Sequence, residues 1–213
     1  MGPRGRNNGY SGPVVAIGAS GPQGMNDIGR VLGGLPVGLR AVVMVVLHRP
    51  TDQVSHLRLI LSRATKLPVL VASQDLLLEA GTCYIGEPDA HLELGARSMG
   101  NLVPATDHRH RNRTIDLLFK SVARHAGPRF IGVVLAGSLD DGSRGLAAIH
   151  HAGGTTMVVT PGQAAFVGMP ENAIAYDGAI DVIGSPERIA AEIVARVGVA
   201  DGRREATIVP LAL

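Results

Sequence analysis

The 213-residue sequence has one cysteine, no tryptophan, and only three phenylalanines and three tyrosines. A lone cysteine, Cys83, cannot form an internal disulfide, so we expect a reducing compartment, the cytoplasm. Because aromatic residues are scarce, the core must be built from Val, Leu, Ile and Ala. That composition favours layered α/β packing with buried parallel strands over a β-sandwich. The length suffices for one compact domain with a sizeable core.

Long hydrophobic runs and a strong charge of one sign are also missing. The longest apolar run, residues 39–47, is interrupted by Arg40 and is far shorter than the roughly 20 residues of a membrane-spanning helix. The first twelve residues lack the apolar centre of a signal peptide. Twenty basic and eighteen acidic residues give a net charge of +2, with only two lysines. We therefore expect neither membrane insertion nor nucleic-acid binding.

Hydrophobic runs and turn residues alternate along most of the chain. After a Gly-rich leader, residues 1–12, the pattern predicts strands at 14–17, 41–47, 69–71, 82–85, 92–94, 130–135 and 155–159, and helices at 23–32, 53–62, 115–125, 143–152 and 186–197. The middle of the chain, with its short strands around Glu87-Pro88-Asp89, predicts an antiparallel hairpin. Elsewhere, strands that alternate with helices predict a doubly wound, mainly parallel sheet covered on both faces.

Three residues suited to hydrolytic chemistry follow three of the predicted strands. Ser20 follows the first strand, His48 directly follows the second, and Asp141 lies in the turn after the strand that ends at residue 135. Because parallel strands end at one edge of a sheet, these side chains can meet there. A serine hydroxyl needs a histidine to accept its proton and an acid to orient that imidazole. The sequence therefore predicts a Ser-His-Asp site.

Small residues around Ser20, in Gly18-Ala19-Ser20-Gly21, permit a tight turn from strand to helix. The backbone N–H of Gly21, at the start of the helix, can donate to a developing oxyanion. Each candidate also has a purely structural interpretation, which the sequence leaves open. Ser20 would be a helix N-cap, His48 a polar loop residue, and Asp141 a turn or cap residue.

A rival interpretation uses the same turn to bind a dinucleotide. Gly18, Gly21 and Gly24 have the spacing of some pyrophosphate-binding turns. The ribose-binding acid expected about 20 residues further on is missing, although Arg49 could contact the 2′-phosphate of NADP. No tyrosine precedes a lysine by four residues, as short-chain dehydrogenase chemistry would require. An NADP-dependent reductase is therefore our third hypothesis, after a hydrolase that uses the Ser-His-Asp site and a non-catalytic binding module.

Other histidines do not predict a metal site. His108 and His110 form an H-x-H pair, but Arg109 and Arg111 beside them oppose cation binding, so we expect a solvated loop and no metal. His91 is equally consistent with a residue packed beside the hairpin and with a residue near the cleft. Cys83 lies in a predicted strand and is expected to be a buried small hydrophobe.

Several blocks of sequence, spread over most of the chain, form an ordered set: Ile17-Gly18-Ala19-Ser20, Val45-Val46-Leu47-His48, residues 78–92, Thr114-Ile115-Asp116-Leu117-Leu118-Phe119, Leu135-Ala136-Gly137 continuing to Asp140-Asp141-Gly142, and Val167-Gly168-Met169-Pro170. In content and order these blocks resemble the chemotaxis protein-glutamate methylesterases, the CheB-type esterase family. Any single block is unspecific, whereas their joint order and spacing are specific.

The resemblance implies a seven-stranded, mainly parallel sheet and a catalytic triad of Ser20, His48 and Asp141. It implies hydrolysis of glutamyl γ-methyl esters on the cytoplasmic part of chemoreceptors, with deamidation of receptor glutamine in some members, and no cofactor. The expected partner is a methyl-accepting chemoreceptor or a similar methylated signalling protein. We expect the domain to span residues 13–199, followed by a tail at 200–213. Because only 19 residues precede Ser20, we expect no receiver domain.

Two departures from the family pattern adjoin the predicted site. The family's Gly-Ala-Ser-Thr-Gly-Gly is here continued after Ser20 by Gly21, Pro22 and Gln23, and its Gly-Met-Gly is here Gly137-Ser138-Leu139. The oxyanion-hole candidates are accordingly Gly21 and Ser138. These departures support a second hypothesis: a catalytically impaired signalling module that binds the receptor without turnover.

Overall fold

A computed structural model describes residues 11–49, 55–88, 90–96, 99–104, 113–126, 129–162 and 168–200. Several residues singled out by the sequence lie outside these ranges. They are most of the predicted leader, all but the first residue of the predicted tail, His108 and His110, and two members of the family blocks, Asp89 and Val167.

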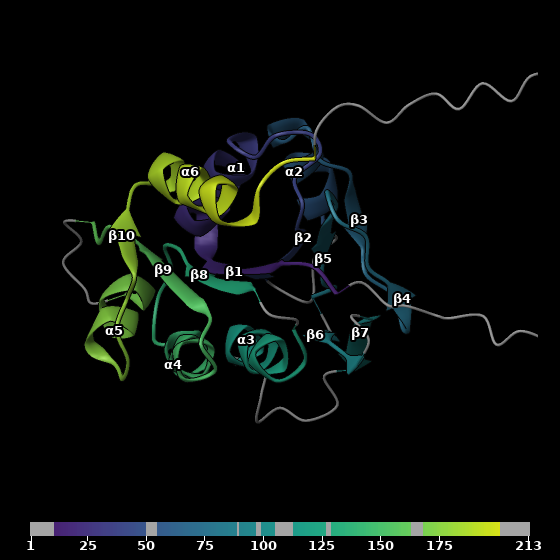
Figure 1. The fold of residues 1–213 in the computed structure, drawn as a ribbon. Helices are drawn as coiled ribbons and strands as arrows, with labels where there is room; N and C mark the ends of the chain where they lie inside the picture. The colour runs from purple at the N-terminus through teal and green to yellow at the C-terminus, as the bar shows by residue number, and fades with distance from the viewer. Residues whose placement is uncertain are drawn as a thin grey trace, which may run out of the picture.

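A seven-stranded sheet forms the centre of the molecule (Figure 1). Its spatial order is β10-β9-β8-β1-β2-β5-β3, and each pair of neighbouring strands is parallel. The strands are β1 (Val14–Ser20), β2 (Val42–His48), β3 (Val69–Val71), β5 (Cys83–Ile85), β8 (Phe130–Val134), β9 (Thr155–Val159) and β10 (Val182–Gly184). The predicted seven-stranded parallel sheet is thereby confirmed.

Helices cover both faces of this sheet, as a doubly wound fold requires (Figure 1). One face carries α1 (Gly21–Gly33), α2 (Leu57–Ala64) and α6 (Pro186–Val197), and the other carries α3 (Thr114–His125), α4 (Ser143–His151) and α5 (Met169–Ala175). Strand β1 is buried on both sides because its side chains alternate between the two layers. Ile17 and Ala19 pack with α1 and α6, whereas Ala16 packs with α3 and α4.

The predicted small antiparallel element is confirmed as a separate sheet in the order β4-β7-β6. Its strands are β4 (Leu76–Leu77), β6 (Ala90–Leu94) and β7 (Met99–Pro104). Its hairpin is formed by β6 and β7, whereas β5, the strand before Glu87 and Pro88, joins the parallel sheet. The sequence pattern did not predict β4, β7, β10 or α5. Three of these elements are very short, and β7 contains Gly100 and Asn101, which are uncommon in strands.

Two predicted boundaries were wrong by three residues or more. Strand β1 continues to Ser20 instead of ending at residue 17, because Ser20 still pairs with His48 of β2 and its N–H donates to the Ala136 carbonyl at 3.0 Å. The helix expected from residue 53 begins at Leu57, with His56 in a non-helical backbone conformation before it. Within the described ranges, no helix combines the length and apolar character needed to cross a bilayer.

Candidate active site

The predicted site residues lie where the order of the sheet reverses direction. From β1 the sheet extends through β2, β5 and β3 on one side and through β8, β9 and β10 on the other. Doubly wound sheets bind ligands outside the carboxyl ends of the strands at such a point. Ser20 ends β1, His48 ends β2, and Asp141 lies in the loop between β8 and α4.

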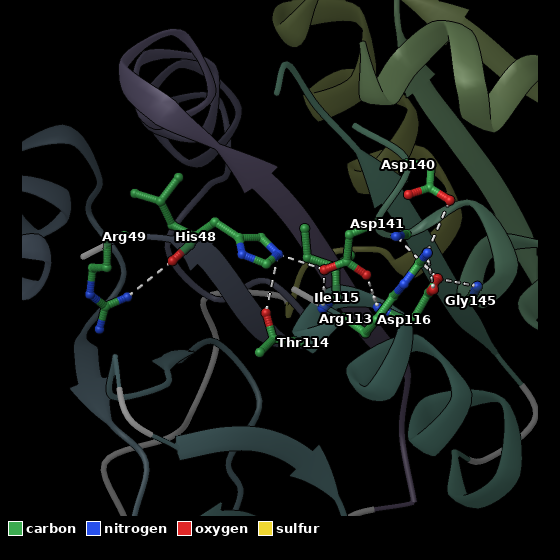
Figure 2. A network of polar contacts seen from close by, with 11 residues as sticks. His48, Arg49, Arg113, Thr114, Ile115, Asp116, Asp140, Asp141 and Gly145 are labelled. Atoms are coloured by element: carbon green, nitrogen blue, oxygen red, sulfur yellow. Dashed lines mark hydrogen bonds and ion pairs between the residues drawn. The ribbon is translucent and has the colours of Figure 1, made fainter. Parts of the chain in front are cut away.

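The structure brings His48 and Asp141 into direct contact (Figure 2). The imidazole Nε2 lies 2.6 Å from Oδ2 of Asp141, and the Thr114 hydroxyl lies 3.3 Å from the same nitrogen. The Asp141 side chain is 5% exposed and the His48 side chain 22%. A hydrogen bond this short from an imidazole N–H to a buried carboxylate is a strong, charge-assisted one. It leaves Nδ1 as the second ring nitrogen for chemistry.

Ser20 and His48 occupy the same register on neighbouring strands. Neighbouring strands lie about 4.8 Å apart, and residues two apart on a strand share a face. Ala16 on β1 and Val46 on β2 both belong to the core layer beneath α3. Because Ser20 and His48 lie an even number of residues further along, both side chains project from that same face. The backbone therefore places Ser20 and His48 as neighbours on one face of the sheet, although no hydrogen bond joins the Ser20 hydroxyl to the imidazole among the described contacts of these two residues.

Ser20 occupies the N-cap position of α1 with its backbone, but its side chain does not cap the helix. Ser20 takes the N-cap position of α1 in an extended conformation, but its hydroxyl makes no capping hydrogen bond to the described first turn of that helix. An N-cap oxygen accepts from the second or third helical N–H, and the second position here is Pro22, which has none. The hydroxyl is thus not committed to the helix.

Asp141 is fixed by the backbone of α3 as well as by His48. Its Oδ1 accepts from the N–H of Asp116 and its Oδ2 from the N–H of Ile115, both at 2.9 Å. The positive end of the α3 dipole favours a carboxylate at this place. Asp141 is therefore both a cap, as the structural interpretation held, and the partner of the imidazole. No role for Thr114 or Asp116 was predicted from the sequence. The signal available for Asp116 was an acidic residue in the first turn of a predicted helix.

The two oxyanion-hole candidates flank Ser20. Gly21 has φ +70°, a conformation that favours glycine, and it begins α1. Ser138 forms an isolated antiparallel bridge with Gly168, and the neighbouring Gly137 carbonyl accepts from the Met169 N–H at 2.8 Å. Gly137 approaches the serine so closely that an added Cβ would lie 2.8 Å from the Cβ of Ser20.

A cleft of about 810 Å³ opens beside Ser20, between α1, α6 and the loops that follow β8 and β9, and its volume is that of a small-molecule site. Gly21, Ser138 and the exposed side chain of Leu139 line it, whereas neither His48 nor Asp141 does. Ser20 thus stands between the cleft and the His48–Asp141 pair.

The lining of the cleft includes two charged residues, Asp27 and Arg30, that were not predicted from the sequence. Asp27 is buried and accepts a hydrogen bond from Gln23 at 2.9 Å, and Arg30 lies 3.8 Å from it. Burial raises the pKa of Asp27, opposed by the Gln23 and Ala136 hydrogen bonds and by Arg30. Arg30 also forms two hydrogen bonds to Glu187 on α6, at 2.7 and 2.9 Å. The sequence did contain a signal for these two residues: acidic Asp27 lies three residues before basic Arg30 on the helix that follows Ser20.

The residues that suggested a dinucleotide site are engaged in contacts within the protein. Arg49 donates to the carbonyls of Gly86 at 2.5 Å and Leu47 at 3.4 Å, so its guanidinium is bound to the backbone. Gly24 admits the Ala136 carbonyl, which a Cβ would meet at 2.5 Å. The role of Gly24 is therefore close packing of α1 against the sheet.

The remaining candidates lie away from the cleft lining. Cys83 is buried in β5, and burial raises the pKa of its thiol to about 12, as expected of a small hydrophobe. His91 is buried in β6, beside the rest of the hairpin. The described part of the chain contains no group of three or more potential metal-ligating side chains.

Comparison with known proteins places this geometry in one family. The model of the family "CheB methylesterase" matches residues 15–193. The chain is 36% identical to protein-glutamate methylesterase/protein-glutamine glutaminase 3 of Geobacter sulfurreducens over 87% of its own length and 50% of that protein. It is 33% identical to the Salmonella typhi protein-glutamate methylesterase/protein-glutamine glutaminase over 80% of its length and 49% of that protein. The chain thus spans about half the length of these relatives.

A solved structure supports the same assignment. The crystal structure of the Thermotoga maritima CheB methylesterase catalytic domain superimposes with a TM-score of 0.78 and 25% identity, covering 87% of this chain and 99% of that one. The shared architecture includes the parallel sheet whose edge carries Ser20 and His48. The family match over most of the chain, the relatives above 30% identity and the common fold agree, and the chain therefore belongs to the CheB methylesterase family.

Proposed function

We propose that this chain is a protein-glutamate methylesterase. Its substrates would be glutamyl γ-methyl esters on the cytoplasmic part of methyl-accepting chemoreceptors or similar methylated signalling proteins, and water would be the final acyl acceptor. The names of the relatives, which join a methylesterase to a glutaminase, support a second reaction at the same site, the deamidation of glutamine. The proposed reactions take place in the cytoplasm and need no cofactor.

One observation carries the proposal: Nε2 of His48 is held 2.6 Å from the buried carboxylate of Asp141, one strand away from Ser20 at the same register. With Nε2–H donating to Asp141, Nδ1 accepts the proton of the Ser20 hydroxyl as its oxygen attacks the ester carbonyl. Asp141 remains ionised and stabilises the imidazolium that forms. The backbone N–H groups near Gly21 and Ser138 stabilise the oxyanion of the tetrahedral intermediate.

Collapse of that intermediate breaks the bond to the methoxy oxygen. His48 returns its proton to this oxygen, methanol leaves, and an acyl-enzyme remains on Ser20. Water then attacks the acyl-enzyme with His48 again as the base, which frees the Ser20 hydroxyl and leaves the receptor residue with a glutamate side-chain carboxylate. With glutamine as substrate the same steps release ammonia.

Methanol release from a methylated chemoreceptor tests the proposal. Wild-type protein is compared with Ser20→Ala and with Ser62→Ala, a matched change at an exposed serine on α2. We expect Ser20→Ala to lose about three orders of magnitude or more in rate and Ser62→Ala to keep the wild-type rate. Undiminished release by Ser20→Ala would refute the mechanism.

The impaired module remains the alternative, and specific features favour testing it. Pro22 removes a backbone donor from the first turn of α1, and Leu139 replaces a glycine of the family pattern beside the cleft. Labelling by a fluorophosphonate separates the two functions, because only a nucleophilic serine reacts. Receptor binding without labelling or methanol release would support the module and overturn the esterase.

A further inference from the structure

Two buried aspartates hold the first turns of each other's helices (Figure 2). Asp141 precedes α4 and accepts from the N–H groups of Ile115 and Asp116 in α3. Asp116 belongs to α3, and its Oδ1 accepts from the N–H groups of Gly142 at 3.1 Å and Gly145 at 2.7 Å. The exchange is reciprocal: each carboxylate satisfies backbone donors that the other's helix leaves unpaired.

Close packing of α3 against α4 makes this exchange geometrically feasible. A Cβ on Gly145 would lie 2.6 Å from the Cβ of Phe119 and 3.0 Å from the Cα of Asp116, so only glycine fits between the helices. Gly142, one of the two donors to Asp116, directly follows Asp141 and has φ +97°. The Asp116 carboxylate therefore fixes the backbone from which the Asp141 side chain leaves.

Side chains of both charges lie near the Asp116 carboxylate. Arg113 places Nη1 3.5 Å from Oδ2 of Asp116 and 3.1 Å from Oδ2 of Asp140, and Lys120 on α3 contributes a more distant positive charge. Burial raises the pKa of Asp116; the hydrogen bond from Gly145 opposes that rise, and the Asp141 carboxylate adds to it. Keeping two carboxylates together in a buried place costs free energy, which the four backbone hydrogen bonds offset.

We propose that Asp116 is a positioning residue for the proposed reaction: through Gly142 and the first turn of α3 it holds the Asp141 carboxylate in line with Nε2 of His48. The inference rests on the proposed function, since it assigns Asp116 a part in the same site. Asp116 does not touch the reacting atoms. It acts on them through Asp141, and a small displacement of that carboxylate would misalign the imidazole.

Two substitutions separate the hydrogen bonds of Asp116 from its bulk. Asp116→Asn keeps an oxygen for the Gly142 and Gly145 donors, whereas Asp116→Ala removes it. We expect Asp116→Ala to lower kcat about 10- to 100-fold and to keep KM within twofold of the wild-type value. Losses of this size are typical of residues that orient a catalytic side chain without touching the substrate. Asp116→Asn is expected to restore kcat to within about threefold of wild type, because the acceptor is retained.

Asp181→Ala is the matched control. Asp181 also accepts a backbone N–H, that of Thr156 at 2.8 Å, but near the start of β9, at the opposite edge of the sheet from the site. A purely structural role for Asp116 predicts that both alanine variants lose stability and that neither loses kcat per folded molecule. That result, or a kcat of Asp116→Ala within twofold of wild type, would overturn the inference. If Asp116→Ala does not fold, Asp116→Ser, whose hydroxyl is too short to reach both donors, takes its place.

A second readout does not depend on turnover. The Nε2 proton of His48, hydrogen-bonded to a carboxylate, gives a downfield proton NMR signal that His48→Gln abolishes and thereby assigns. We expect Asp116→Ala to shift this signal upfield or broaden it, and Asp181→Ala to leave it in place. An unchanged signal in Asp116→Ala would contradict the inference even if the wild-type protein hydrolyses no ester, so the two failures are distinguishable.

Discussion

The imidazole of His48 and the carboxylate of Asp141 lie 2.6 Å apart, although 93 residues separate them in the chain. Their contact depends on the sheet order, because β2 and β8 both flank β1 and end at the same edge. Ser20 ends β1, which lies between β2, the strand that carries His48, and β8, the strand whose following loop carries Asp141. The proposed chemistry therefore depends on the order of the strands. Substitutions that disturb this edge of the sheet should lower the catalytic rate more than they lower the free energy of unfolding.

Asp141→Asn should lower kcat by about three to four orders of magnitude with little change in KM. The amide keeps the size of the side chain but presents a neutral group to His48, so the imidazolium is no longer stabilised. Steady-state kinetics on a methylated receptor measure both constants. Asp177→Asn, at an exposed position beside His151, is the control and should match wild type. A fall of less than tenfold for Asp141→Asn would contradict the assigned role.

Gly137→Ala should slow the reaction and destabilise the fold by about 1–3 kcal/mol. The new Cβ would lie 2.3 Å from Sδ of Met169, 2.8 Å from the Cβ of Ser20 and 3.0 Å from the backbone nitrogen of Ser20, so the loop must shift relative to both Met169 and the nucleophile. Gly29→Ala in α1 has only an ordinary contact, 3.5 Å from Ala64, and should instead stabilise the helix by about 1 kcal/mol. Chemical denaturation measures the stability of both variants, and initial rates measure their activity. Equal changes of stability and rate in Gly137→Ala and Gly29→Ala would refute the close approach of Gly137 to Ser20.

Leu139→Gly should raise the free energy of unfolding by about 1 kcal/mol. Leu139 has φ +68°, a conformation that costs a non-glycine residue about 1–2 kcal/mol, and its 67% exposed side chain contributes little packing. The same substitution at Leu59, half exposed in α2, should destabilise by about 1 kcal/mol. Urea unfolding of both variants tests the opposite signs, and destabilisation of similar size in both would show that Leu139 is unstrained.

The buried carboxyl of Asp27 makes a prediction about pH. Burial raises its pKa in the folded state above the ordinary value of 3.8, so the folded protein binds this proton more tightly than the unfolded chain does. The resulting stabilisation is complete below pH 3.8 and is lost as pH rises through the folded-state pKa. Relative to wild type, Asp27→Asn should therefore gain stability between about pH 4 and pH 7.

Urea unfolding across that pH range measures the effect. Gln23→Ala removes a hydrogen bond that lowers the pKa of Asp27, so its own loss of stability should extend to higher pH than in wild type. A stability difference between Asp27→Asn and wild type that does not change with pH would disprove the raised pKa.

Periodicity and turn residues were sufficient to predict the parallel sheet, because β1, β2, β8 and β9 are apolar runs followed by glycine, proline or polar residues. The same reasoning placed Ser20, His48 and Asp141 at one edge. It could not predict that Asp116 and Asp141 exchange caps, since that depends on the packing distance between α3 and α4 set by Gly145. Nor could it predict α5 or β10, whose few residues are ordered by the tertiary contacts around them.

The most direct measurement of the central claim is fluorophosphonate labelling followed by peptide mass spectrometry. The account predicts one phosphonylated residue, Ser20, in wild-type protein and labelling slowed by about 1,000-fold or more in His48→Gln, because the hydroxyl loses its base. Labelling that is absent, that falls on another residue, or that proceeds equally fast in His48→Gln would contradict it.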